Sequence, residues 1–260
     1  QDAGQDDDAV RLLVDAEDWA GLVSLITFAA PAAVAAARGQ TVLRWIERVP
    51  WGLQERDPWL LYWRAVCRSP VNLTEGRRDA ERAFRIFRQV RERTGALLSW
   101  AAAVSAYVHE AEDLAPLDAY LAELEPLLAD GAGFPSPETE LVVTTATLGA
   151  LVLRQPANGR VHRWAERAAA LVREVPEGEP RDLLALQLIA YRYWTGDLSE
   201  AHRLGETMEE SLRRREAPPL TRTALRMLVT RLRWLTARPV ELRAVEEAVR
   251  LARSHGLASH

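Results

Sequence analysis

The stretch that decides the fold runs from residue 191 to residue 201 and reads YRYWTGDLSEA. Its first four residues end an apolar segment with helical spacing, and three of them are aromatic. Gly196 and Asp197 follow, and both residue types favour tight turns. Ala201 is small enough to let a returning helix approach the first one closely. The stretch therefore predicts two antiparallel helices joined by a short turn.

Similar hairpins recur along the chain at fairly even spacing. Breaks at Pro58, Gly95, Pro137, Pro180 and Pro219 lie 37, 42, 43 and 39 residues apart, and each interval holds two helical patterns. The Gly-Asp-x-x-x-Ala turn resembles that of tetratricopeptide repeats, although these intervals exceed the roughly 34 residues of the standard repeat. We therefore expect an all-α fold, a right-handed superhelical solenoid of tetratricopeptide-like helical hairpins, with a helical bundle as the alternative.

Helical patterning extends over almost the whole chain, and sustained strand-like alternation is missing. In the helix predicted for residues 74–94, one side is an apolar stripe made of Ala80, Ala83, Phe84, Phe87 and Val90. The other side carries Arg78, Arg82, Arg85 and Arg93. The predicted helices are 7–16, 19–37, 40–48, 58–68, 74–94, 96–111, 114–130, 136–154, 160–174, 181–195, 198–216, 219–236 and 239–255.

Two regions are expected: an N-terminal helical lead-in over residues 1–56 and one continuous solenoid over residues 57–260. The only methionines are Met208 and Met227, so the chain does not begin with Met. We expect it to be processed or to be an excised piece of a longer protein.

The composition excludes several classes of protein. With 260 residues, 48% hydrophobic and 27% charged, the chain is neither disordered nor stapled by disulfides. All 33 basic residues are arginine, which excludes a phosphate-binding loop of the GxxxxGK[ST] type and lysine Schiff-base chemistry. Residues 1–18 hold seven acids against one arginine, so the rest of this −4 chain carries +2. Such a balance argues against direct contact with nucleic acid.

Cys67 is the single cysteine and lies in an apolar stretch, which predicts a buried, inert thiol and is compatible with a reducing compartment. No apolar run reaches the roughly 18 residues of a membrane span, and the N-terminus is acidic rather than signal-like. These observations favour a cytoplasmic location and no membrane contact.

The residues that could carry chemistry form no catalytic pattern. The five histidines include no HExxH motif and no pair at i,i+4 spacing, and the carboxylates are scattered at helix-surface spacing. We expect no enzyme activity, no catalytic residue, no metal and no cofactor.

Tryptophan is unusually frequent, with nine residues. Packing between hairpins is the favoured interpretation, and a stacking platform for a ligand is the alternative. A platform would involve the first helices of successive hairpins, because these line the concave face of a solenoid. The candidate residues of such an effector groove are Trp63, Arg64, Tyr107, His109, Tyr191 and Arg192. The arginines of helix 74–94 could contact phosphates, but Glu81, Glu92 and the balanced charge favour a solvated face.

One segment is more specific than the periodicity. Residues 39–50, GQTVLRWIERVP, resemble an element with a Trp-Ile or Trp-Leu pair and a closing proline in large ATP-dependent LuxR-type regulators, the group containing the maltose regulon activator. Residues 58–63, PWLLYW, resemble the start of the first repeat in that group. The motifs cover about the first 70 residues, and the rest matches only as generic repeats.

The resemblance implies a sensor region between an NTPase module and a DNA-binding or activator module of a bacterial transcriptional regulator. Its partner would be a small-molecule inducer or a regulatory protein. This chain has no nucleotide-binding loop and no recognisable helix-turn-helix after residue 219, so neither ATP binding nor DNA binding is carried over. The competing interpretation is a general protein–protein scaffold that holds a peptide or partner helix in its concave groove.

Overall fold

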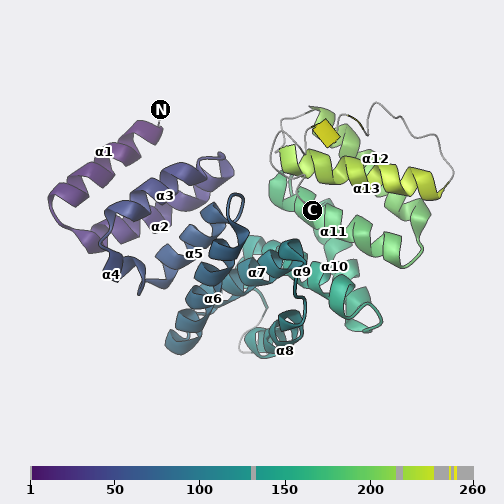
Figure 1. Cartoon of the computed structure of the whole chain (residues 1–260), viewed down its shortest axis with the longest axis horizontal. Coiled ribbons are helices and arrows are strands. Elements are labelled where there is room, and N and C mark those ends of the chain that lie inside the picture. Colours follow the sequence, from purple (N-terminus) through teal and green to yellow (C-terminus); the bar gives the residue numbers. More distant parts are fainter. Residues whose placement is uncertain (1, 130–132, 215–218, 237–245, 247–248, 251–260) are drawn as a thin grey trace. The chain divides into compact units, whose positions relative to one another are not determined.

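The computed structural model describes residues 2–129, 133–214, 219–236, 246 and 249–250 (Figure 1). Every regular element in these residues is an α-helix, which confirms the all-α expectation. In chain order the helices are α1 (Asp2–Asp15), α2 (Trp19–Ala35), α3 (Gly39–Arg48), α4 (Trp51–Gln54), α5 (Pro58–Arg68), α6 (Leu73–Val90), α7 (Arg93–Glu110), α8 (Pro116–Ala129), α9 (Pro137–Arg154), α10 (Arg160–Glu174), α11 (Glu179–Trp194), α12 (Leu198–Arg214) and α13 (Pro219–Leu235).

Most helices lie within a few residues of their predicted bounds, with two exceptions. The short helix α4, which follows Pro50, was not predicted. The helix expected over residues 239–255 falls almost entirely outside the described residues.

The break between α6 and α7 lies at Arg91 and Glu92, not at Gly95 as predicted. Arg91 adopts the left-handed conformation, with φ of 57°, and ends α6. The Glu92 carboxylate then accepts hydrogen bonds from the backbone N–H groups of Thr94 and Gly95, at 3.0 and 2.6 Å, and so caps α7. The glycine therefore lies inside the first turn of α7.

Two residues assigned to the faces of the predicted helix 74–94, Val90 and Arg93, lie elsewhere than expected. Val90, expected in the apolar stripe, is 63% exposed at the end of α6, so the buried stripe ends at Phe87. Arg93, expected opposite the stripe, belongs to α7. Its guanidinium donates to the backbone carbonyl of Leu127, 3.2 Å away, at the end of α8, where helix carbonyls lack intrahelical partners.

Contacts divide the chain into two compact units, residues 1–139 and residues 140–260. The division falls in the first turn of α9. The predicted limit between a lead-in and the repeats, at residues 56 and 57, lies within the first unit, in the turn before α5. There α5 packs against both α2 and α3.

In the first unit, α5 packs against the helix that follows it, α6, and against the next but one, α7, and α6 packs against α7. Helices α5, α6 and α7 lie side by side in this way (Figure 1). Three buried alanines, Ala65, Ala80 and Ala103, meet at the junction of these helices and allow close approach. A β-carbon on Gly76 would lie 2.5 Å from the Ser69 hydroxyl oxygen and 3.0 Å from the Ala65 carbonyl oxygen, so glycine allows α6 to approach α5 closely here.

The second unit repeats this packing pattern. Helix α11 contacts α10, α12 and α13, and α12 contacts α13. The small residues of α12 make the close contacts: Ala201 is fully buried, and a β-carbon on Gly205 would lie 2.9 Å from a methyl of Val229 in α13.

The predicted Gly-Asp turn joins α11 to α12. Gly196 has φ of 81°, a left-handed conformation that glycine adopts without steric cost. The Asp197 carboxylate accepts a hydrogen bond from the backbone N–H of Glu200, at 3.3 Å, and so caps α12. The stretch that decided the fold in the sequence thus forms a hairpin, with Ala201 at the close approach that was predicted.

Candidate functional site

The six candidate groove residues divide between the two units. Trp63 and Arg64 lie on α5, and Tyr107 and His109 lie on α7, all in the first unit. Tyr191 and Arg192 lie on α11 in the second unit.

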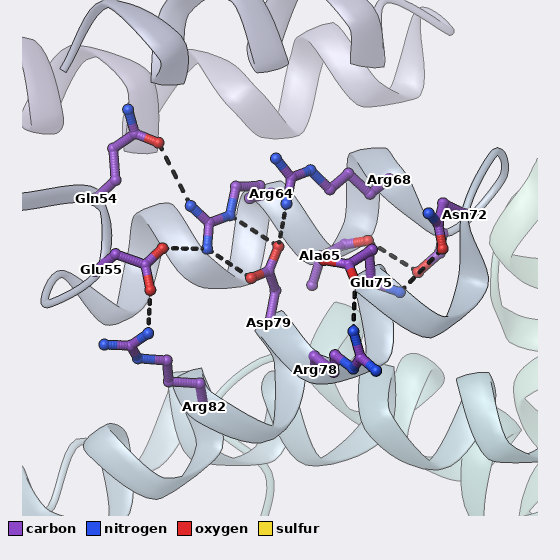
Figure 2. A network of polar contacts seen from close by, with 11 residues as sticks. Gln54, Glu55, Arg64, Ala65, Arg68, Asn72, Glu75, Arg78, Asp79 and Arg82 are labelled. Atoms are coloured by element: carbon purple, nitrogen blue, oxygen red, sulfur yellow. Dashed lines mark hydrogen bonds and ion pairs between the residues drawn. The ribbon is translucent and has the colours of Figure 1, made fainter. Parts of the chain in front are cut away.

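Arg64 is buried at the centre of a polar network, with 3% of its surface exposed. Its guanidinium donates to both carboxylate oxygens of Asp79, from Nε at 2.8 Å and from Nη2 at 2.6 Å. Nη2 also donates to Glu55 Oε1 at 2.7 Å, and Nη1 lies 3.4 Å from the Gln54 amide oxygen (Figure 2). With its donors engaged in this way, Arg64 joins α5, α6 and the end of α4 rather than facing a ligand.

The charges in this network balance closely enough to be buried. Burial alone would lower the pKa of Arg64, but hydrogen bonds and charge from Asp79 and Glu55 raise it above its ordinary value. Arg68 donates at 3.1 Å to Asp79 Oδ2, the oxygen that also accepts from Arg64 Nε. Removing Asp79 would leave the buried Arg64 with Glu55 as its carboxylate partner, and breaking a buried ion pair in this way is destabilising.

Trp63 is also mostly buried, with 8% exposed. Its ring packs edge-on against Tyr62, with the ring centroids 4.8 Å apart. Its indole N–H has no hydrogen-bond partner among the described residues. A buried N–H donor without an acceptor lowers the stability of the fold. Trp63 is therefore well packed but leaves its indole N–H unsatisfied among the described residues.

Tyr107 belongs to a second cluster, which links α6 to α7. Its hydroxyl donates to Glu81 Oε1 at 2.7 Å and accepts from Arg77 at 3.2 Å, and the Arg77 guanidinium stacks 4.6 Å from the ring centroid. Arg77 also pairs with Glu110 at 2.7 Å. Partial burial, together with the Glu81 carboxylate, raises the pKa of Tyr107.

The other three candidates differ in exposure. His109 is exposed, and its Nδ1 lies 2.6 Å from the Ser105 carbonyl on its own helix. Tyr191 is 7% exposed, and its hydroxyl lies 3.3 Å from Nδ1 of His162. Arg192 is partly exposed and pairs with Asp197 at 3.3 Å.

One concavity of the first unit is lined by none of these residues. An open hollow of about 510 Å³ lies between the end of α4 and one face of α6. Its lining residues are Glu55, Arg56, Arg82, Arg85, Ile86 and Gln89. The four α6 residues have i, i+3, i+4 and i+7 spacing, which places them on one helix face.

The sequence pointed to only two of the six residues that line this hollow. Arg82 and Arg85 were noted as an exposed stripe, which matches their place on α6. Glu55 and Arg56 were missed, because α4 and the turn after it were not predicted. The contact between Glu55 and Arg82 joins residues 27 apart in sequence, and no local spacing predicts it.

Three of the nine tryptophans, Trp45, Trp63 and Trp100, are buried as the favoured interpretation predicts, three are partly buried and three are exposed. Trp100 is fully buried, and its indole N–H donates to the Tyr120 carbonyl at 2.9 Å. Trp51, Trp194 and Trp234 are 66%, 63% and 72% exposed.

Other chemistry-bearing groups form no centre in the described part of the chain. No group of three or more His, Cys, Asp or Glu side chains there could hold a metal ion. Cys67 is buried, as predicted, and burial raises its pKa to about 12. None of the described helices is both long and apolar enough to cross a lipid bilayer.

The comparisons with known proteins do not assign a family. A scan against models of protein families finds no match. A search of curated proteins finds no match either.

Proposed function

We propose that this chain is a non-catalytic helical-repeat module that binds an effector or a partner protein, and that its hairpins form a right-handed solenoid of tetratricopeptide-like repeats. The observation that carries the proposal is the packing of each helix against its neighbour and its next neighbour, seen in α5–α7 and again in α11–α13. Stacked hairpins of this kind contact only adjacent hairpins, so one face stays free for a ligand.

The regulator context is the finer part of the proposal and rests on the resemblance of residues 39–50. These residues contain α3, in which Trp45 and Ile46 are almost fully buried. Since α3 packs against both α2 and α5, the segment is a structural junction that leads into the hairpins. A junction at that point is what a sensor region of a LuxR-type regulator requires where its repeats begin.

The alternative, a general scaffold for a peptide or partner helix, is favoured by the exposed tryptophans. Trp194 and Trp234 of the second unit present large apolar surfaces to solvent, and aromatic side chains are enriched in protein interfaces. The sequence of the parent gene distinguishes the regulator from the scaffold. A GxxxxGK[ST] loop encoded upstream of this chain and a helix-turn-helix encoded downstream would favour the regulator.

A thermal-shift screen of the 260-residue chain tests the binding proposal. A ligand that binds only the folded state at about 100 times its Kd adds about 2.7 kcal/mol of stability and raises the unfolding temperature by several degrees. The probes are neutral sugars, nucleotides, small oxyanions and peptides. We expect one class to raise the unfolding temperature in proportion to the logarithm of its concentration, and a flat response to every class would contradict the proposal.

A further inference from the structure

The open hollow beside α6 has the charge of an anion-binding site. Three arginines and one glutamate line it, giving its wall a net charge of +2 in a chain whose total is −4. A volume of about 510 Å³ is within the usual range of small-molecule sites.

Glu55 neutralises only part of this wall. Its Oε1 accepts from the buried Arg64 at 2.7 Å, and its Oε2 pairs with Arg82 (Figure 2). Both oxygens of the carboxylate are therefore engaged, one of them by a cation that does not line the hollow. Because the network of Arg64 holds Glu55, it also fixes the position of Arg82.

The other two arginines retain their charge without a carboxylate partner among the described residues. Arg85 donates only from Nε to the Glu81 backbone carbonyl, at 3.4 Å, and Arg56 makes no ion pair there. A guanidinium has five N–H donors and no acceptor, and it matches carboxylate or phosphate oxygens in pairs.

The backbone that carries these side chains is well fixed. Arg56 follows α4, and its N–H donates to the Leu53 carbonyl at 3.0 Å. Asp57 then caps α5, accepting from the N–H groups of Trp59 and Leu60, both at 2.9 Å. Arg85 lies within α6, and Ile86 adds an apolar surface beside the charges. Because this backbone is already ordered, binding a ligand costs entropy mainly in the arginine side chains.

We propose that this hollow binds a small oxyanion through Arg56, Arg82 and Arg85. The oxyanion would carry at least two negative charges, as a polycarboxylate or a phosphate compound does. The inference rests on the proposed function, since it names the chemistry of the effector. It also reinterprets the arginine stripe of α6: the solvated face expected from sequence becomes, with the turn after α4, one wall of a site.

Isothermal titration calorimetry with citrate and with pyrophosphate tests the inference, and glucose serves as the neutral probe. We expect at least one of the two anions to bind with a stoichiometry of one and glucose not to bind in the hollow. Citrate without pyrophosphate would indicate a carboxylate ligand, and the reverse a phosphate ligand.

The variants are Arg56→Gln and Arg85→Gln, with Arg163→Gln as the matched control. Arg56, Arg85 and Arg163 are all exposed, so each substitution should leave the unfolding temperature unchanged. Arg163 lies on α10 in the second unit. Each hollow variant should weaken anion binding about tenfold or more, the loss of a hydrogen bond to a charged group, and the control less than about twofold.

The failure of this inference is distinguishable from failure of the proposed function. Equal weakening in all three variants, or in none, would overturn the anion site. So would stabilisation by a neutral sugar or a peptide with no anion binding, but that result would leave the binding module in place. If no probe of any class binds, both proposals fail.

Discussion

Two aromatic–arginine pairs, Trp63–Arg64 on α5 and Tyr191–Arg192 on α11, meet opposite surroundings. Arg64 is 3% exposed and makes a two-pronged contact with Asp79, fifteen residues later on the returning helix. Arg192 is partly exposed and makes one contact of 3.3 Å with Asp197, five residues later in the turn. The position of the aspartate explains this difference. Asp79 lies on the second helix, so its ion pair joins the two helices, whereas Asp197 lies in the turn directly after the helix that carries Arg192.

The two hairpins are consequently held together differently. Both place small residues one turn apart on the returning helix, Gly76 and Ala80 on α6, and Ala201 and Gly205 on α12. The first also has a charge network, Arg64 with Asp79 and Glu55, buried across its helix–helix contact. We infer that the first hairpin depends on the pairing of Arg64 with Asp79, whereas the ion pair of Arg192 with Asp197 contributes little to the second.

Asp79→Ala compared with Asp197→Ala tests this contrast and should give the largest effect. Without Asp79, the buried Arg64 loses its two-pronged partner and keeps only Glu55, which it shares with Arg82. Breaking a buried ion pair costs about 3–5 kcal/mol. Asp197→Ala removes a half-exposed ion pair and a helix cap, at about 1 kcal/mol. Hydrogen exchange of α5–α6 and of α11–α12 reads each effect in its own unit.

A double variant separates charge burial from simple loss of packing. In Arg64→Met with Asp79→Leu, no buried charge of the pair remains, and apolar replacements of buried ion pairs are often neutral or stabilising. We expect most of the protection of α5–α6 to return. If the double variant is as unprotected as Asp79→Ala, the network matters for shape rather than charge.

Trp100→Ala and Trp194→Ala extend the comparison to apolar packing. Trp100 is fully buried on α7 with its N–H satisfied, so truncation should cost about 3–5 kcal/mol. Trp194, 63% exposed on α11, should change stability by no more than about 0.5 kcal/mol. Urea titrations followed by circular dichroism measure both. A large loss in Trp194→Ala would mean that this side chain is covered in solution.

The sequence predicted what depends on neighbours in the chain. Helical periodicity located most helices, and the stretch from residue 191 to residue 201 predicted its own hairpin. The contacts of Arg64 could not be predicted, because Asp79 and Glu55 reach it from two other elements. The hollow was missed for a related reason: a four-residue helix such as α4 has too little periodicity to be recognised. Gly95 misled because glycine serves close packing inside a helix as well as its end.

Cys67 provides a pH-dependent test of how well the packing of α5 excludes solvent from its buried side chains. Burial raises the pKa of its thiol to about 12, whereas an unfolded cysteine titrates near 8.5. The folded state therefore keeps a proton that the unfolded state loses. This contribution is complete below about pH 8.5 and is lost as the pH rises toward 12.

We expect the advantage of the wild type over Cys67→Ala in urea to shrink by about 1–2 kcal/mol between pH 7.5 and pH 10. A thiol reagent at pH 8 should modify the folded wild type far more slowly than the urea-unfolded chain. Rapid modification of the folded chain would show that α5 opens readily, and the contrast between the two hairpins would lose its basis.

The smallest effects should come from the turns that follow α6 and α11. Both place a residue in the left-handed conformation, Arg91 with φ of 57° and Gly196 with φ of 81°. A residue with a side chain loses roughly 1–2 kcal/mol of stability in that conformation. Glycine avoids this strain, but it loses more backbone entropy on folding, which offsets about half of the gain. Gly196→Ala should therefore destabilise the second hairpin by about 1 kcal/mol, and Arg91→Gly should stabilise the first unit by up to about 1 kcal/mol. Hydrogen exchange of the first turns of α12 and α7 measures the two changes, which should have opposite signs. If Arg91→Gly destabilises instead, the Arg91 side chain makes contacts that outweigh its backbone strain, and the turn of the first unit, like its hairpin, is held by arginine.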